Sequence, residues 1–266
     1  MRSFLSAFVR IAGIASLLFT AGTHALAAEL VVGANIGNVP WEFQDASGEF
    51  VGFELDLARE VGKRLNRPVE VVNIPFNGLF SAVQSGRIDI AVSSITITEK
   101  RLSSVAFVQP YYDSAQSLTV SARSAATGLE DMRGKVVGVD TGSTGDMWTT
   151  SMQDQYEFAD IRRFEGLAPA MLDMQTGRID GYISDIPSLE YFIKDKPYFK
   201  VIERIETGER YSMMLAKNNP LVDEIDAIIT TLKQEGFVSA LHKHWFGTVA
   251  AESSSTVMVT ERPATR

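Results

Sequence analysis

The stretch Ser85-Gly86-Arg87-Ile88-Asp89 (SGRID) occurs a second time in the chain, as Thr176-Gly177-Arg178-Ile179-Asp180 (TGRID). Each copy follows a predicted helix and opens a predicted strand. One supersecondary unit that repeats once over such a distance is typical of two similar lobes and not of a solenoid. The same register pairs Ser94 in the first half of the chain with Asp185 in the second.

Around each copy, apolar runs of strand length alternate with amphipathic runs of helix length. This alternation predicts an α/β fold in which a mostly parallel sheet carries helices on both faces. The expected elements are strand 30–34, helix 50–65, strand 69–74, helix 76–84, strand 88–92, strand 135–140, helix 168–175, strand 179–184 and helix 222–237.

Two apolar extended runs, 118–120 and 211–215, flank the second half of the chain. We expect the chain to cross between the lobes there, so that the second lobe is inserted into the first. The predicted lobes are 28–117 together with 212–249, and 118–211.

Both ends of the chain are expected to lie outside the fold. Arg2 and Arg10 bracket a short basic region, the run 11–21 after it is apolar, and Ala25-Leu26-Ala27 supplies the small residues of a cleavage site. Residues 1–27 are therefore predicted to be a secretory signal peptide. Residues 250–266 are polar, serine-rich and without a period, so we expect a disordered tail.

Composition limits the location and the partners of the exported chain. The chain has no cysteine, which excludes disulfides, thiolate metal sites and a lipid-modified cysteine anchor, so we expect it to diffuse freely in the periplasm. The formal charge is −8. A protein this acidic is a poor partner for nucleic acid or anionic membrane. We expect a monomer.

Ligands of open α/β sheets bind beyond the carboxyl ends of the strands. Four segments of this chain lie at such positions, 35–41, 93–101, 140–145 and 184–185. Two come from each predicted lobe, so we expect them to meet in a cleft between the lobes.

The segment 93–101 has the chemistry of a carboxylate site. Ser93, Ser94 and Thr96 supply hydroxyls at a strand end, and Thr98 is placed to cap a helix that carries Arg101. Taken alone, the segment favours an ordinary strand-to-helix turn in which Arg101 pairs with a surface acid.

The glycine loop 141–145 is also open to two interpretations. It resembles a phosphate cradle, but it lacks the lysine of a P-loop. A backbone nest for a carboxylate and a plain strand-to-helix turn both fit. His242 and His244 lie near a predicted helix end and do not form a recognisable catalytic or metal-binding set.

Together these motifs resemble the bacterial periplasmic binding proteins for polar amino acids, which serve ABC importers. The resemblance runs from Leu30 to about Gly247. Its most specific pieces are VGFELDLA at 51–58, PFNGL at 75–79, the run 93–101, QPYY at 109–112, GSTG at 142–145 and KHWFG at 243–247.

The resemblance implies the two-lobed fold of that family and a role for several residues. Arg101 corresponds to the family arginine that holds the ligand α-carboxylate, with backbone N–H groups at Ser143 and Thr144. Asp185 corresponds to the carboxylate that receives the α-ammonium. The Ser94 carbonyl and Thr96 hydroxyl complete that shell, and Phe76 matches an aromatic that stacks on the ligand side chain.

The chain departs from the family at the entrance to this site. Asn35 stands where many members have aspartate, and Asn38 stands where many have an aromatic, although Trp41 is near. Asp140, at the edge of the glycine loop, offers another negative charge or faces solvent. Both an uncharged, glutamine-like ligand and a cationic one remain open.

The resemblance implies a non-enzymatic protein that captures an amino acid by hinge closure and delivers it to a membrane ABC permease, without cofactor or metal. Two alternatives share the fold. One is a periplasmic enzyme similar to cyclohexadienyl dehydratase, which needs a general acid or base beyond Arg101 and Asp185. The other is a ligand sensor that docks on a membrane receptor.

Overall fold

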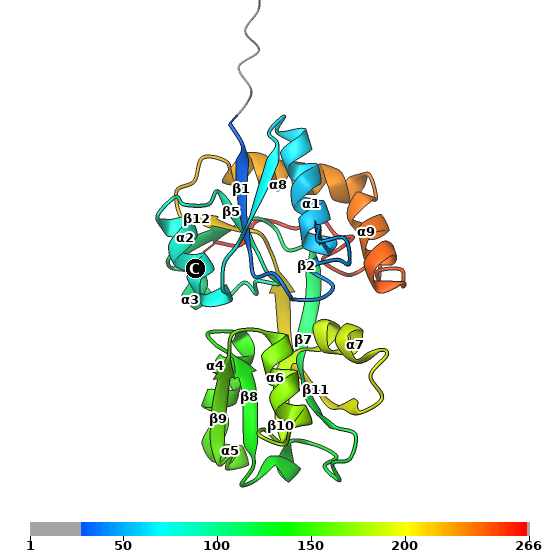
Figure 1. Ribbon diagram of the computed structural model, residues 1–266. Helices are drawn as coiled ribbons and strands as arrows, with labels where there is room; N and C mark the ends of the chain where they lie inside the picture. Colours follow the sequence, from blue (N-terminus) through cyan, green and yellow to red (C-terminus); the bar gives the residue numbers. More distant parts are fainter. Residues whose placement is uncertain (1–27, 265–266) are drawn as a thin grey trace, which may run out of the picture.

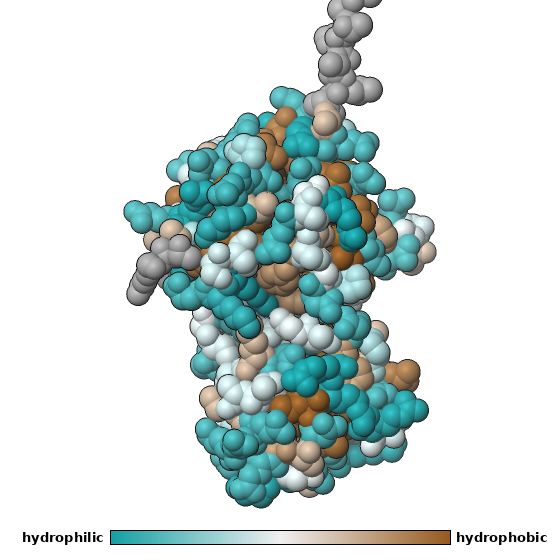
Figure 2. All heavy atoms as spheres, turned by 90° about the vertical axis from the view of Figure 1, so that its left-hand side faces the viewer, coloured by the Kyte–Doolittle hydropathy of each residue, from teal (hydrophilic) through white to brown (hydrophobic). Residues whose placement is uncertain are grey.

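The computed structural model describes residues 28–264, so the predicted signal peptide at 1–27 lies outside the described residues. The described chain forms two lobes, each built on one five-stranded sheet. Two long strands, β7 (Tyr112–Ser121) and β11 (Phe199–Tyr211), run between the lobes (Figure 1). The molecular surface narrows where the lobes meet (Figure 2). The predicted two-lobed α/β fold is confirmed.

The first lobe has the strand order β4-β1-β5-β12-β6. β1 is parallel to both of its neighbours and β12 is antiparallel to both of its own, so four of the five strands share one direction. The strands are β1 (Leu30–Ala34), β4 (Val69–Asn73), β5 (Ile90–Val92), β6 (Val105–Phe107) and β12 (Met214–Ala216).

Alternating side chains of these strands face two separate cores. Val32 and Ile90 pack under one group of helices, while Ala91 packs under the other. The first group is α1 (Phe53–Arg64), α8 (Val222–Gln234) and α9 (Phe237–Phe246), and the second is α2 (Phe76–Gln84) and α3 (Glu99–Leu102). A short hairpin of β2 (Phe43–Gln44) and β3 (Phe50–Val51) precedes α1.

The second lobe repeats this plan in the order β9-β8-β10-β7-β11. β8 is parallel to both neighbours, and β7 is antiparallel to both of its own. The further elements are the 3-10 helix η1 (Leu129–Met132), β8 (Val136–Asp140), α4 (Thr144–Ser151), α5 (Gln153–Tyr156), β9 (Asp160–Phe164), α6 (Leu167–Gln175), β10 (Gly181–Asp185) and α7 (Ile186–Ile193).

The repeated sequence has the same structure in both lobes. Gly86 and Gly177 follow α2 and α6 with φ of 73° each, a left-handed conformation that glycine adopts without steric cost. The next turn ends at Asp89 and Asp180, whose carboxylates accept the backbone N–H groups of Val31 and Val136, both at 2.9 Å. Each copy therefore ends a helix and joins the following strand, which is central in its sheet, to the neighbouring strand β1 or β8.

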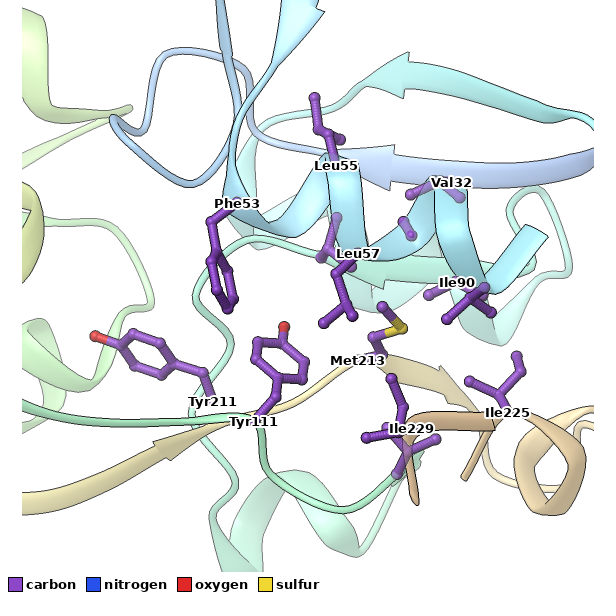
Figure 3. Packing of buried hydrophobic residues seen from close by; sticks show 14 of the residues in the cluster. Val32, Phe53, Leu55, Leu57, Ile90, Tyr111, Tyr211, Met213, Ile225 and Ile229 are labelled. Atoms are coloured by element: carbon purple, nitrogen blue, oxygen red, sulfur yellow. The ribbon is translucent and has the colours of Figure 1, made fainter. Parts of the chain in front are cut away.

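Large aromatic side chains fill the first lobe beside the two crossing strands. Figure 3 shows Phe53 of α1 next to Tyr111 and Tyr211, with Leu57 and Ile229 farther along the same core. All five side chains are buried. Burying one large apolar side chain contributes roughly 1.5–3 kcal/mol, so this cluster anchors both strands in the first lobe.

The predicted helix 222–237 is present as α8 but ends earlier, at Gln234. Gly236 has φ of 75°, and it separates α8 from α9, which begins at Phe237. The predicted end was three residues too late because the apolar periodicity continues across the glycine.

The crossing points also differ from the prediction. β7 pairs with β11 from Tyr112↔Tyr211 to Ser121↔Phe199, so 118–120 lies inside the second sheet. The run 211–215 is divided between β11 and β12. The predicted bounds of the lobes stay a prediction, since both strands are continuous between them.

The expected disorder of residues 250–266 is contradicted over 250–264. Ser255 donates its N–H and hydroxyl to the Asp113 carboxylate at 2.7 and 2.5 Å, and Thr256 donates to the Tyr111 carbonyl at 3.0 Å. The buried ammonium of Lys233 donates to the Met258 carbonyl at 2.9 Å. The composition of the tail could not predict these contacts, because their partners lie more than a hundred residues away or in helix α8. Within 28–264, no helix is long and apolar enough to cross a membrane.

Candidate functional site

A cavity of about 140 Å³ lies between the lobes at the carboxyl ends of the central strands. It brings together all but one of the residues predicted for the site. Those lining it are Asn35, Asn38, Phe76, Ser93, Ser94, Thr96, Arg101, Asp140, Ser143, Thr144 and Asp185.

Trp41 does not line the cavity. Its ring is fully buried and makes edge contacts with Phe53, Tyr112 and Tyr211, at centroid distances of 5.6, 4.6 and 5.3 Å. Its Nε1–H donates to Ser188 Oγ in the other lobe at 2.9 Å. Trp41 therefore belongs to the core and to the contact between lobes, since the loop after β1 turns its ring inward.

Arg101 is held at one end of the cavity. Thr98 caps α3 as predicted, because its side-chain oxygen accepts the Arg101 N–H at 3.2 Å. The guanidinium donates to the carbonyls of Thr96 (2.7 Å) and, across the cleft, Gly142 (3.3 Å). Its Cζ lies 5.5 and 5.2 Å from the ring centroids of Phe76 and Phe80.

The charge of Arg101 is available for a ligand. The side chain is 6% exposed, and burial lowers its pKa to about 10, which still leaves it charged at neutral pH. Among residues 28–264, no carboxylate forms an ion pair with it. Because a guanidinium has five N–H donors, it retains donors for an incoming carboxylate.

Asp185 lies on the opposite lobe, at the end of β10. Its carboxylate accepts Ser94 Oγ from the first lobe at 3.1 Å and Gln116 Nε2 at 2.6 Å. Burial raises the pKa of Asp185 well above its usual value, and the neighbouring carboxylate of Glu209 raises it further. A ligand cation at this position would relieve both effects.

Glu209 and Gln116 were missed by the sequence analysis. Glu209 is buried, and its carboxylate accepts Gln116 Nε2 at 3.0 and 3.1 Å and Thr96 Oγ1 at 3.2 Å. Gln116 thereby lies between two carboxylates, those of Asp185 and Glu209. Both residues belong to the crossing strands, which showed no polar motif in the sequence.

The far wall of the cavity carries further acids. Asp140 accepts the backbone N–H of Gly166 at 3.1 Å, and burial raises its pKa to about 6. Glu165 beside it adds repulsion that also raises the pKa of Asp140. Residues 164–169, from the end of β9 to the first turn of α6, also line the cavity and were not predicted. The register that pairs Ser94 with Asp185 also pairs Phe76 with Leu167 in this segment.

The glycine loop forms the start of α4. Gly142 has φ of 72°, and Ser143 caps the helix because its Oγ accepts the Asp146 N–H at 3.0 Å. Thr144 Oγ1 lies 3.5 Å from Thr96 Oγ1 of the other lobe. The loop therefore brings backbone groups at a helix N-terminus close to Arg101.

Direct hydrogen bonds join the lobes around the cavity. Ser188 Oγ accepts from Trp41 and donates to Asn38 Oδ1 at 3.0 Å, and Asn38 Nδ2 donates to Ser94 Oγ at 3.0 Å. The described lobes are closed. Asn38 is thus a link between lobes as well as part of the cavity wall.

The cavity is lined by a cationic side chain at Arg101 and an acidic one at Asp185, with the buried Glu209 behind it. This arrangement complements a small molecule that carries a carboxylate and an ammonium group. Among the residues from 28 to 264, no group of three or more His, Asp and Glu side chains is arranged to hold a metal ion.

Comparisons with known proteins agree with this description. The family model of bacterial extracellular solute-binding proteins, family 3, matches residues 30–248. The arginine-binding periplasmic protein of Mannheimia haemolytica is 28% identical over 238 residues, covering 87% of this chain and 97% of the relative. The putative ABC transporter arginine-binding protein 2 of Escherichia coli strain K12 is 27% identical over 240 residues, covering 88% and 97%.

A solved structure of an ancestral arginine-binding protein bound to arginine superposes with a TM-score of 0.79 at 30% identity. It covers 84% of this chain and all of its own. Fold, cavity and sequence thus agree, and the chain belongs to the bacterial extracellular solute-binding proteins, family 3.

Proposed function

We propose that this protein is the amino acid-binding component of an ABC importer, and that it captures an amino acid with a cationic side chain in the periplasm. The observation that carries the proposal is the placement of Arg101 and Asp185 on opposite lobes, facing one cavity. A zwitterion needs one cation and one anion about the length of its backbone apart. These two residues supply them, and the ligand then connects the lobes.

The charge of the cavity favours a cationic side chain. Its lining includes the acids Asp140, Glu165 and Asp185 with a single arginine, and the buried Glu209 adds another negative charge behind it. An amino acid with an uncharged side chain carries one positive and one negative charge, so it leaves the excess negative charge of the cavity uncompensated. A guanidinium or ammonium on the side chain, directed toward Asp140, reduces it. The relatives named as arginine-binding proteins support this preference.

Capture proceeds by closure of the lobes about the two crossing strands. The bonds from Trp41 through Ser188 to Asn38 form only when the lobes meet, so they add to the free energy of the closed, liganded state. The closed surface is then what a membrane permease would recognise. We further propose that the protein acts as a monomer and without turnover of its ligand.

The test is calorimetric titration of the mature chain with L-arginine, L-lysine, L-histidine and L-glutamine, alongside thermal unfolding with the same ligands. We expect one ligand per chain, the tightest binding for a cationic amino acid, and recovery of the ligand unchanged. Stabilisation should follow mass action, about 2.7 kcal/mol at a hundredfold excess over Kd. Absence of binding by all four amino acids would overturn the proposal, and consumption of the ligand would favour a periplasmic enzyme on the same fold.

A further inference from the structure

Two buried glutamates lie behind the ammonium end of the cavity and do not line it. Glu42 and Glu54 are both fully buried. The backbone N–H of Glu54 donates to the Trp41 carbonyl at 3.1 Å, which brings the start of α1 against the residue before Glu42. The consecutive residues Ser93 and Ser94 donate to Glu42 Oε1 at 2.7 Å and to Glu54 Oε2 at 2.8 Å, so the two carboxyl groups are neighbours. Burying two negatively charged carboxylates next to each other costs folding free energy, both through desolvation and through their mutual repulsion.

The two carboxyl groups have different surroundings. Both oxygens of Glu54 accept from donors that are fixed in place. Its Oε2 accepts the Ser94 backbone N–H at 2.8 Å, and its Oε1 accepts the Tyr111 hydroxyl at 2.5 Å. Figure 3 shows the Tyr111 hydroxyl directed toward the beginning of α1. Glu54 also lies in the first turn of α1, where the helix dipole favours a negative charge.

Only one of the two carboxyl oxygens of Glu42 accepts hydrogen bonds from fixed donors. Its Oε1 accepts Asn38 Nδ2 at 3.0 Å and Ser93 Oγ at 2.7 Å. Its Oε2 is buried and has no donor among the described residues. A proton on Oε2, donated to the neighbouring carboxylate, is the simplest way to satisfy that atom.

We propose that Glu42 and Glu54 share one proton, carried by Glu42 Oε2, and that this pair positions the ammonium end of the site through Asn38, Ser93 and Ser94. The part that concerns ligand affinity rests on the function proposed above. Glu42 and Glu54 are positioning residues, since they act through three residues that line the cavity: Glu42 through the side chains of Asn38 and Ser93, and Glu54 through the backbone N–H of Ser94.

Two further observations support the pair. Ser94 has φ of 44°, a left-handed conformation that a non-glycine residue adopts only when its surroundings hold it, and Glu54 accepts its N–H. Burial and the adjacent Glu54 raise the pKa of Glu42 well above its usual value. Tyr111 is the other titratable group that faces the pair, and burial keeps it neutral by raising its pKa.

The experiment compares E42Q, E42A and E54Q with the wild-type protein. Glutamine at 42 can keep its carbonyl toward Asn38 and Ser93 and turn its amide N–H toward Glu54, so we expect affinity within about twofold of wild type. E42A removes these bonds and should weaken binding at least about tenfold. Glutamine at 54 must turn its amide toward Ser94 N–H or the Tyr111 hydroxyl, so E54Q should resemble E42A.

A second measurement needs no ligand. The pKa of Glu42 is raised in the folded state, so its proton contributes stability that is lost as pH rises through the folded pKa. Glutamine does not titrate. The melting temperature of E42Q relative to wild type should therefore increase as pH rises from about 5 to about 8.

If the difference in melting temperature between E42Q and wild type stays constant across that pH range, the shared proton is overturned. Equal loss of affinity in E42Q and E42A, or wild-type affinity in both E42A and E54Q, would overturn the positioning role. If the wild-type protein binds no amino acid, the function fails and the melting curves still decide on the proton. If E54Q does not fold, E42Q and E42A decide alone.

Discussion

Replacing Arg101 with methionine should separate ligand binding from stability. In the proposed complex, two guanidinium N–H groups meet the two oxygens of the α-carboxylate in a buried site. A hydrogen bond to a charged group contributes about 1.5–3 kcal/mol, so the pair contributes about 3–6 kcal/mol. At about 1.4 kcal/mol per factor of ten, R101M should bind every amino acid about 10²- to 10⁴-fold more weakly.

The ligand-free protein should tolerate the same change. Methionine keeps an apolar stem beside Phe76 and Phe80, and it removes a buried cation that has no ion-paired carboxylate among residues 28–264. Such replacements are often neutral or stabilising. The two lost bonds to the carbonyls of Thr96 and Gly142 act in the opposite direction. We therefore expect the melting temperature to change by less than about 4 °C, which corresponds to about 1 kcal/mol for a chain of this size.

Titration calorimetry with L-arginine, L-lysine and L-glutamine measures the first effect, and calorimetric melting without ligand measures the second. K100M is the matched control, because Lys100 is the exposed neighbour of Arg101 on the same helix. Loss of affinity for only one of the ligands would refute the assignment to the shared carboxylate. A collapse of the ligand-free fold in R101M would show that the guanidinium is structural.

Three further outcomes follow from the same geometry. D140N should weaken the binding of L-arginine about tenfold and the binding of L-glutamine less. Because the pKa of Asp140 is about 6 and a bound cation favours its ionised form, the affinity of the wild-type protein for L-arginine should fall between about pH 7.5 and about pH 5. Titration calorimetry should find this pH dependence reduced in D140N. S188A removes the bonds to Trp41 and Asn38 that join the lobes, so titration should show every ligand weakened by a similar factor of about ten, and an effect on one ligand alone would contradict the closure mechanism. A chain that ends at Ala250 loses the contacts of Ser255 to Asp113 in β7 and of Thr256 to Tyr111 just before it, and should melt about 4–8 °C lower. A chain that ends at Glu261 keeps these contacts and should melt like wild type.

The sequence was sufficient for the two lobes because local and repeated signals agree there. The strand 30–34 and the helix 76–84 occur as predicted, since an apolar run and an amphipathic period each specify their element. The repeat also located Asp185 opposite Ser94, and these two side chains are hydrogen bonded. What failed depends on distant partners. The tail 250–264 is polar in composition, and its order comes from Asp113 and Lys233, which no local pattern connects with it.

The site followed the same division. Residues at strand ends, such as Ser93 and Asp140, could be predicted because the sheet edge collects them. Trp41 was misplaced because composition does not show which way an aromatic at a loop turns. Glu209 was missed because its strand was expected only to connect the lobes. The buried pair of Glu42 and Glu54 had no signal at all, since acids at those positions are ordinarily exposed.

The repeat that builds the cavity from two equivalent lobes has a stereochemical consequence. Ser94 and Asp185 occupy matching positions in that register, and so do Arg101 and Phe192, yet each pair differs in charge. The architecture is nearly symmetric, and the electrostatics are not. Under the proposed function, Arg101, Asp185 and Asp140 each direct one substituent of the ligand α-carbon. Three fixed directions at a tetrahedral centre define a handedness, so the cavity distinguishes an L-amino acid from its mirror image without any contact dedicated to that purpose.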